Sequence, residues 1–123
     1  MAEERDILYL LNLCGATSED KNPKIKKIIK EKRGKTIVGV CGVIKRHTIL
    51  PAVFLAVNPK YQGQGIGKKL IKKLLTKYKG ILFLTVSLSN KPAYNIYKQN
   101  GFVRILPWRK LGNKNDIWLM IRL

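Results

Sequence analysis

The sequence predicts an α/β (α+β) fold in a single domain over residues 1–123. Apolar runs of strand length alternate with segments whose apolar residues recur at helical spacing. Hydrophobic residues make up 46% of the chain, which is enough for a domain of this length to bury a substantial core. Strands and helices are therefore expected to pack in layers around that core.

The first part of the chain is predicted to hold one helix and three strands. Residues 6–14 have apolar side chains at helical spacing, and the polar segment 15–23 is rich in turn residues. Residues 25–46 are predicted to form two strands about a turn at residues 33–35. Residues 51–57 are a continuous apolar run, typical of a central strand that is covered on both faces.

A lysine-rich helix is predicted over residues 66–78. Its apolar residues form one stripe along the helix, which is expected to face the core. The opposite face carries Lys68, Lys69, Lys72, Lys73 and Lys77. Gly80 is expected to end this helix, because glycine is common just beyond a helix C-terminus.

The last part of the chain is predicted to add a strand, a helix and two further strands. Residues 81–88 form another apolar run of strand length. Asn90 is the predicted N-cap of the helix that follows, and Gly101 is its predicted end. Residues 102–110 and 116–123 are the predicted final strands.

The charge is strongly positive, with 25 Lys and Arg against 7 Asp and Glu, a net charge of +18. Such a balance favours anionic ligands, namely a phosphorylated cofactor, nucleic acid or an acidic substrate. A lysine- and isoleucine-rich proteome, such as that of a thermophile, would explain much of the excess equally well. The charge therefore indicates classes of partner and does not decide among them.

The cysteines and the N-terminus indicate a compartment. Cys14 and Cys41 lie far apart, in no metal-ligand spacing, which favours a reduced cytoplasmic protein without a metal site. Both are expected to be small core residues. The N-terminus begins with acids and so does not resemble a secretory signal, and no apolar run approaches the length of a membrane span.

The glycine-rich stretch at residues 61–69, YQGQGIGKK, lies between a buried strand and the lysine-rich helix. It is not a Rossmann fingerprint, because Gly67 comes one residue too early. It is not a P-loop either, because Gln62 and Lys69 replace the first Gly and the final Ser or Thr. Its position still offers unpaired amides and a helix dipole to an anion. The alternative is a glycine-rich turn with solvated lysines.

Two motifs resemble those of the GNAT superfamily of acyl-CoA N-acetyltransferases. Residues 62–67, QGQGIG, match the signature Q/R-x-x-G-x-G/A. A second signature, N-x-x-A-x-x-x-Y followed by G-F, is matched by Asn90, Ala93, Tyr97, Gly101 and Phe102. The resemblance runs from about Ile25 to the C-terminus. It implies a mixed, mostly antiparallel central sheet, flanked by helices and splayed into a V between strands 51–57 and 81–88, where acetyl-CoA would lie.

The resemblance also implies roles for individual residues. It implies that the pyrophosphate of acetyl-CoA is bound by the amides of Gln62, Gly63, Gln64, Gly65, Ile66, Gly67 and Lys68. It implies that the strand edge at Leu55, Ala56 and Val57 pairs with the pantetheine arm, which Asn90 helps to hold. It implies that Tyr97 reprotonates the coenzyme A thiolate as it leaves. The alternative is that Tyr97 is an aromatic residue of the helix that only packs against the sheet.

The sequence departs from the family in two ways. Only about 24 residues precede Ile25, so the family's first strand is expected to be missing or shortened, and that region often shapes the acceptor pocket. A general base is not obvious either, although Glu31 is the only acid in the sheet region before the glycine loop. A water chain or an acceptor that arrives neutral would replace it. Weaker candidates for a base are Glu19, Asp20, Asp116 and His47, although His47 is expected to be a solvent-facing turn residue. Trp108 and Trp118 are expected to be packing residues, with the alternative that Trp108 lines an acceptor site.

Three functions remain open at this point. The leading one is an N-acetyltransferase, in which a primary amine of a small molecule or protein attacks acetyl-CoA directly in a ternary complex. The second is a GNAT-like module that binds acyl-CoA without turnover. The third is a basic nucleic-acid-binding protein, although interleaved aromatic residues are lacking. A positive surface favours acidic or neutral partners, no membrane contact is expected, and an exposed last strand could pair two subunits as a homodimer.

Overall fold

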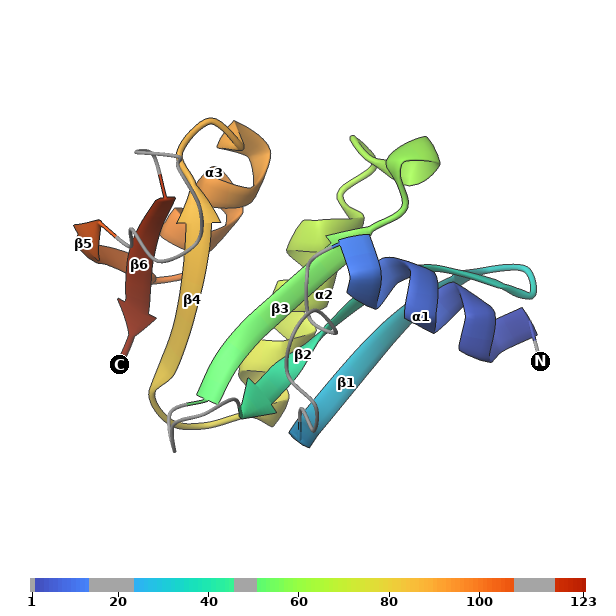
Figure 1. Cartoon of the computed structure of the whole chain (residues 1–123), viewed down its shortest axis with the longest axis horizontal. Coiled ribbons are helices and arrows are strands. Elements are labelled where there is room, and N and C mark those ends of the chain that lie inside the picture. Colours follow the sequence, from blue (N-terminus) through green and yellow to red (C-terminus); the bar gives the residue numbers. More distant parts are fainter. Residues whose placement is uncertain (1, 14–23, 46–50, 108–116) are drawn as a thin grey trace. The chain divides into compact units, whose positions relative to one another are not determined.

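The computed structural model describes residues 2–13, 24–45, 51–107 and 117–123 (Figure 1). These residues form two compact units, Met1–Lys79 and Gly80–Leu123. The prediction of one domain over residues 1–123 stays a prediction. Several residues singled out in the sequence lie outside the described residues, namely Cys14, Glu19, Asp20, His47, Trp108 and Asp116.

The first unit contains three antiparallel strands in the order β1-β2-β3. They are β1 (Lys24–Arg33), β2 (Thr36–Lys45) and β3 (Pro51–Val57). The turn between β1 and β2 lies where it was predicted, and Gly34 adopts a φ of 62° in it, a conformation that glycine tolerates without strain. The strands predicted over residues 25–46 and 51–57 are thereby confirmed.

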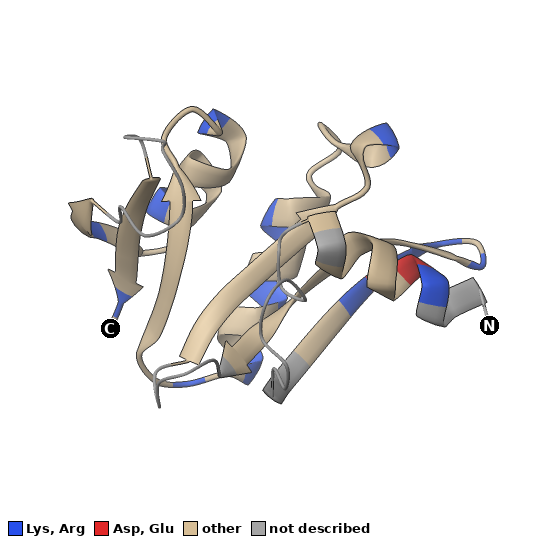
Figure 2. Ribbon diagram, viewed as in Figure 1, with Lys and Arg blue, Asp and Glu red and all other residues tan. Residues whose placement is uncertain are grey.

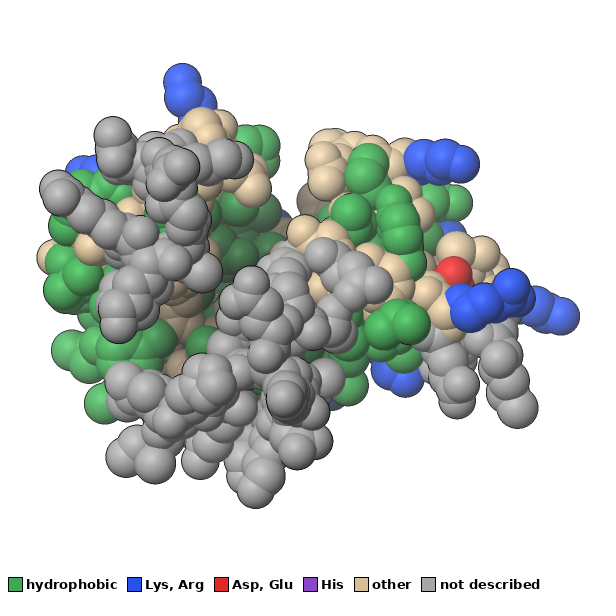
Figure 3. Space-filling view, viewed as in Figure 1, with side chains coloured by type: hydrophobic (Ala, Val, Ile, Leu, Met, Phe, Trp, Pro, Cys, Tyr) green, Lys and Arg blue, Asp and Glu red, His purple; other side chains and the backbone are tan. Residues whose placement is uncertain are grey.

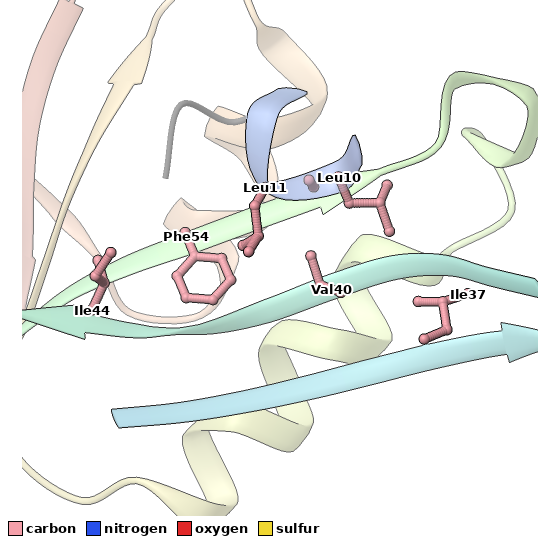
Figure 4. Close-up of a cluster of buried hydrophobic side chains, with 7 residues drawn as sticks. Leu10, Leu11, Ile37, Val40, Ile44 and Phe54 are labelled. Carbon is pink, nitrogen blue, oxygen red and sulfur yellow. The ribbon is translucent and has the colours of Figure 1, made fainter. Parts of the chain in front are cut away.

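Two helices cover opposite faces of these strands, α1 (Ala2–Leu13) and α2 (Ile66–Lys77) (Figure 1). Leu10 and Leu11 of α1 pack against side chains of β2 and β3 (Figure 4). The buried side chains of α2 are Ile66, Leu70, Ile71 and Leu74. Because β3 contacts both helices, the prediction of a strand covered on both faces is confirmed.

Both helices of this unit differ slightly from their predicted bounds. Helix α1 begins at Ala2 rather than at residue 6, and Asp6 ties it to the sheet by accepting a hydrogen bond from the Ile37 amide at 3.1 Å. Helix α2 ends at Lys77, and the extended backbone of Tyr78 terminates it, so the prediction that Gly80 ends the helix is wrong. Gly80 has a φ of 134° in the connection that follows.

The second unit contains three antiparallel strands in the order β4-β6-β5 and one helix. The elements are β4 (Leu82–Ser87), α3 (Lys91–Gln99), β5 (Val103–Pro107) and β6 (Ile117–Arg122). Strand β6 lies between the other two, so the prediction that the last strand is exposed at an edge is wrong. The residues of β5 are all exposed, whereas those of β6 are half-buried or buried, in keeping with the inner position of β6. Hydrophobic side chains also lie at the surface on the face of the molecule that Figure 3 shows.

Helix α3 begins and ends where the sequence predicts. The Asn90 side chain accepts a hydrogen bond from the Ala93 amide at 3.4 Å, as an N-cap does. At the other end, the amides of Gly101 and Phe102 donate to the carbonyls of Lys98 and Tyr97, the pattern of a Schellman motif. Gly101 has the left-handed φ of 93° that this motif needs.

The predicted fold class is confirmed, because helices flank strands that are antiparallel in every pair described within the two units. The splayed V between strands 51–57 and 81–88 stays a prediction. In the part of the chain that the structure describes, no helix combines the length and the apolar character needed to cross a membrane.

Candidate functional site

The glycine-rich loop lies between β3 and α2, after one turn of 3-10 helix, η1 (Pro59–Tyr61). Gly63 and Gly65 have φ values of 81° and 78°. A residue with a Cβ is strained in this left-handed region, so glycine is required at both positions by the backbone. A Cβ at either position would meet nothing within 4 Å, so the loop is open on that side.

The backbone amides from Gly63 to Lys68 donate to no hydrogen-bond acceptor among the residues that the structure describes. The first amide of α2 that donates within the chain is that of Lys69, to the Gly65 carbonyl at 3.0 Å. Unpaired amides and the positive end of the helix dipole together attract an anion. The amides predicted to bind pyrophosphate are therefore available for it, apart from that of Gln62, which points to the Pro59 carbonyl at 3.4 Å.

Polar side chains fix the entrance to the loop. The Asn58 amide donates to the Val38 carbonyl of β2 at 2.8 Å, and the Asn58 side chain accepts from the Lys60 amide at 3.0 Å. The Gln62 side chain donates through Nε2 to the Val57 carbonyl at 3.2 Å. Sequence reasoning assigned to Gln62 only a backbone role, whereas its side chain anchors the loop to the end of β3.

The edge of β3 is the predicted partner of the pantetheine arm. Because the Asn58 amide points to β2 and polar groups alternate along a strand, those of Leu55 and Val57 point away from β2. Ala56 is buried among the side chains that α1 covers. The Val57 carbonyl already accepts a hydrogen bond from the Gln62 side chain, so the backbone groups of Leu55 are the more available ones for the pantetheine arm.

A glycine in β2 sets how closely α2 approaches the sheet. A Cβ on Gly39 would lie 2.9 Å from Leu70 Cδ1 and 3.0 Å from Ile66 Cγ2. Both side chains belong to the first two turns of α2, next to the loop. Sequence reasoning missed Gly39, although an isolated glycine in an apolar strand is a signal that something packs closely there.

Glu31 of β1 forms ion pairs that hold the first turn of α2. Its Oε2 lies 2.8 Å from Lys69 Nζ and 3.4 Å from an Arg33 guanidinium nitrogen. The hydrogen bond from Lys69, together with the charges of Lys69 and Arg33, lowers the pKa of Glu31 below its usual value, although desolvation of the buried carboxylate acts to raise it. A carboxylate with a lowered pKa is a weaker base, so these contacts favour an anchoring role for Glu31 over the predicted role of general base.

The predicted residues of the second unit are Asn90, the N-cap of α3, and Tyr97 within α3. Asn90 is exposed at the start of the helix, and its side-chain oxygen is used in the cap. Tyr97 is only 6% exposed, and its ring packs edge-on against Phe102 with 5.8 Å between the centroids. Packing fixes the orientation of the ring, and this is compatible with either predicted reading of Tyr97.

Trp118 was predicted to be a packing residue, and its surroundings support that prediction. The Arg104 guanidinium lies 5.0 Å from the Trp118 ring centroid and 5.8 Å from that of Tyr94. These cation–π contacts connect β5, β6 and α3 within the second unit. Among the described residues, no group of three or more His, Cys, Asp or Glu is placed to hold a metal ion.

Comparison with known proteins identifies the family. The model of the GNAT acetyltransferase domain matches residues 27–104, which is more than half of the chain. The chain therefore belongs to the GNAT family of acetyltransferases, and the resemblance read from its two motifs is confirmed.

Individual relatives agree with this assignment. The N-alpha-acetyltransferase RimI of Mycobacterium tuberculosis is 34% identical over 77 residues, which cover 58% of this chain and 49% of that protein. An IAA acetyltransferase from Bacillus cereus superposes with a TM-score of 0.72 at 19% identity, covering 94% of this chain and 90% of that one. The acetyltransferase yncA from Salmonella typhimurium, solved with acetyl-CoA, gives a TM-score of 0.65 at 18% identity, covering 76% and 62%. The chain spans half or less of the length of the curated relatives it matches.

Proposed function

We propose that this chain is an N-acetyltransferase that transfers an acetyl group from acetyl-CoA to a primary amine. The observation that carries the proposal is the run of unpaired amides from Gly63 to Lys68 at the start of α2. Acetyl-CoA carries a pyrophosphate, an anion that suits such a run. Lys68 adds a cation at the same place, whereas Lys69 is paired with Glu31.

The remaining predicted residues are proposed to act on other parts of acetyl-CoA. The backbone of β3 at Leu55, Ala56 and Val57 pairs with the pantetheine arm. The side-chain amide nitrogen of Asn90 donates no hydrogen bond within the described residues, so it is available to the arm while the oxygen caps α3. Tyr97 supplies a proton to the thiolate, and packing against Phe102 directs its ring.

The transfer itself is direct. The neutral amine attacks the thioester carbonyl, the carbon–sulfur bond breaks, and the thiolate of coenzyme A takes a proton from the Tyr97 hydroxyl. The proton that the acylated nitrogen loses passes to water, and the Tyr97 phenolate regains a proton from water. Holding the amine and the thioester in one ternary complex supplies much of the acceleration, because a bimolecular step becomes an effectively unimolecular one. No covalent bond to the protein is needed.

The acceptor that suits this chain is an α-amine rather than a lysine side chain. No Asp or Glu occurs from Lys32 to Asn115, and Glu31 is held by two cations. With unperturbed pKa values of about 7.8 for an α-amine and about 10.4 for lysine, about 14% and about 0.04% of each are neutral at pH 7. An α-amine therefore reacts without a strong base. The name of the Mycobacterium tuberculosis relative, an N-alpha-acetyltransferase, supports this choice.

Cofactor binding is tested first by Gly65→Ala, with Gly34→Ala as a matched control. Both glycines have a left-handed φ and nothing within 4 Å of a Cβ, so both substitutions cost about 1–2 kcal/mol of strain. Calorimetric titration with acetyl-CoA should show weaker binding for Gly65→Ala and unchanged binding for Gly34→Ala. Equal affinities for both variants and the wild-type chain would exclude the loop as the cofactor site.

Turnover and acceptor class are tested with two peptides. One has a free α-amine and no lysine, and the other has a blocked N-terminus and one lysine. Mass spectrometry should show acetylation of the first alone, and Tyr97→Phe should lower kcat with little change in the KM for acetyl-CoA. Binding of acetyl-CoA without turnover on a broad amine panel would support the alternative of a non-catalytic acyl-CoA-binding module.

A further inference from the structure

The exposed face of α2 is almost entirely lysine. Its apolar stripe is buried against the sheet, and its exposed positions are Lys68, Lys69, Lys72, Lys73, Thr76 and Lys77. Figure 2 shows Lys and Arg recurring along this helix. Only Lys69 forms an ion pair that the structure describes, with Glu31, and no ion pair within the described residues involves the other four lysines.

Few acidic residues are placed in the sequence to neutralise these lysines. A solvated helix face usually alternates Glu with Lys at spacings of three or four residues, because such pairs stabilise the helix. Here the i, i+4 pairs 68/72, 69/73 and 73/77 are all like charges, which destabilise it. No carboxylate occurs from Lys32 to Asn115 to neutralise them. A uniform face of this kind is suited to a polyanion.

The composition of the face favours nucleic acid over an acidic protein. Protein interfaces are depleted in lysine and rely on aromatic and arginine anchors, and the exposed positions of α2 contain neither. Single-stranded nucleic acid is bound with stacked aromatic side chains, which this face also lacks. Lysines alone suit the phosphates of a duplex, which carry no base-specific information.

We propose that the exposed lysine face of α2 binds the phosphate backbone of double-stranded nucleic acid without sequence preference. The nine residue steps from Lys68 to Lys77 span about 13.5 Å along the helix axis. Along the axis of a duplex each strand carries one phosphate per about 3.4 Å, so a stretch of that length corresponds to about four phosphates of one strand. Apart from Lys68, whose amide belongs to the proposed cofactor site, the face is distinct from the amides of the loop, and the proposal stands whether or not the chain acetylates an amine.

The experiment compares two triple variants with the same change in charge. One replaces Lys72, Lys73 and Lys77 of the face by Gln. The control replaces Lys35, Lys79 and Lys98 by Gln, which are exposed lysines elsewhere in the chain. Lys68 is left in place because it belongs to the proposed cofactor site, and Lys69 because it is paired with Glu31. Glutamine keeps the helix propensity of lysine, so both variants should fold, and circular dichroism checks this.

Binding is measured by fluorescence anisotropy with labelled 20-base-pair RNA and DNA duplexes over a series of salt concentrations. The slope of log K against log salt is about −0.9 for each phosphate neutralised on a duplex. The face variant should reduce the magnitude of the slope by about 2.7 and weaken binding, while the control should leave the slope unchanged. The RNA and DNA arms show which duplex is preferred.

Three results would overturn the proposal. One is no binding of either duplex by the wild-type chain at physiological salt. A second is an equal loss in both variants, because the net charge of +18 would then explain binding without a site. A third is competition by poly-glutamate as effective, charge for charge, as competition by duplex, which would indicate an acidic protein partner. Calorimetry with acetyl-CoA on the same samples reports the proposed function separately.

Discussion

Replacing Gly39 by Ala tests how the sheet positions the start of α2. The new Cβ would lie 2.9 Å from Leu70 Cδ1 and 3.0 Å from Ile66 Cγ2, whereas ordinary contacts begin at 3.4 Å. Leu70 can change its rotamer, but the β-branched Ile66 is stiff at χ1. Both side chains are almost fully buried, so helix α2 itself must move by a few tenths of an ångström.

The expected loss of stability follows from these contacts. Overpacking a buried site costs about 1–3 kcal/mol. Alanine also restricts the unfolded chain more than glycine does, which offsets about 0.5–1 kcal/mol. The free energy of unfolding of Gly39→Ala should therefore fall by about 1–2 kcal/mol. Because Ile66 begins the helix, the loop amides should shift as well and acetyl-CoA should bind several-fold more weakly.

Urea denaturation measures the first effect and calorimetric titration the second. Repeating the substitution in a Leu70→Ala background provides the control, because removing Leu70 Cδ1 leaves space for part of the new methyl group. The loss caused by Gly39→Ala should be smaller in that background, which gives a coupling energy in a double-mutant cycle. A Gly39→Ala variant as stable as the wild type, or an identical loss in both backgrounds, would refute the close approach of α2 to β2.

Three further substitutions test single contacts. Glu31→Gln should lower the free energy of unfolding by about 1 kcal/mol at pH 7. Because the folded pKa of Glu31 is lowered, the ion pair stabilises the fold above pH 4.5, and this contribution is lost as the pH falls through the folded pKa. The urea denaturation curves of variant and wild type should therefore converge in acid. Asn90→Asp keeps the cap oxygen and removes the amide donor, so melting should be unchanged while acetyl-CoA affinity falls; unchanged affinity would remove Asn90 from the site. Arg122→Ala removes the bond from Arg122 Nε to the Asn100 carbonyl at 2.9 Å and should cost about 1–2 kcal/mol in thermal unfolding, with no loss expected if that bond is absent in solution.

Local patterns in the sequence were enough to predict most of the elements. The apolar run of β3 gave its bounds, Asn90 and Gly101 gave the two ends of α3, and Gly34 gave the turn between β1 and β2. Each of these features is decided by the residue itself and its neighbours along the chain, through backbone conformation or capping. The conformations of the loop glycines follow for the same reason.

Contacts between distant residues were not predictable in this way. Glu31 pairs with Lys69, which lies 38 positions further along the sequence, and nothing in the local sequence of either residue indicates this ion pair. The place of β6 between β4 and β5 likewise depends on pairing between segments that are distant in the sequence, and the pattern of a six-residue strand does not reveal its neighbours. Gly39 was visible as a glycine, but the helix that approaches it was not.

The second family motif, at residues 90–102, shapes helix α3 as well as supplying Tyr97. Asn90 starts α3, Ala93 donates the capping amide, and Gly101 and Phe102 end the helix through the carbonyls of Lys98 and Tyr97. Phe102 also holds the Tyr97 ring by an edge contact. The other motif residues thus help to fix where the Tyr97 hydroxyl points, so replacing Asn90, Gly101 or Phe102 by alanine would lower activity whether or not Tyr97 donates a proton. Only the loss of the hydroxyl alone, in Tyr97→Phe, separates its chemistry from its packing.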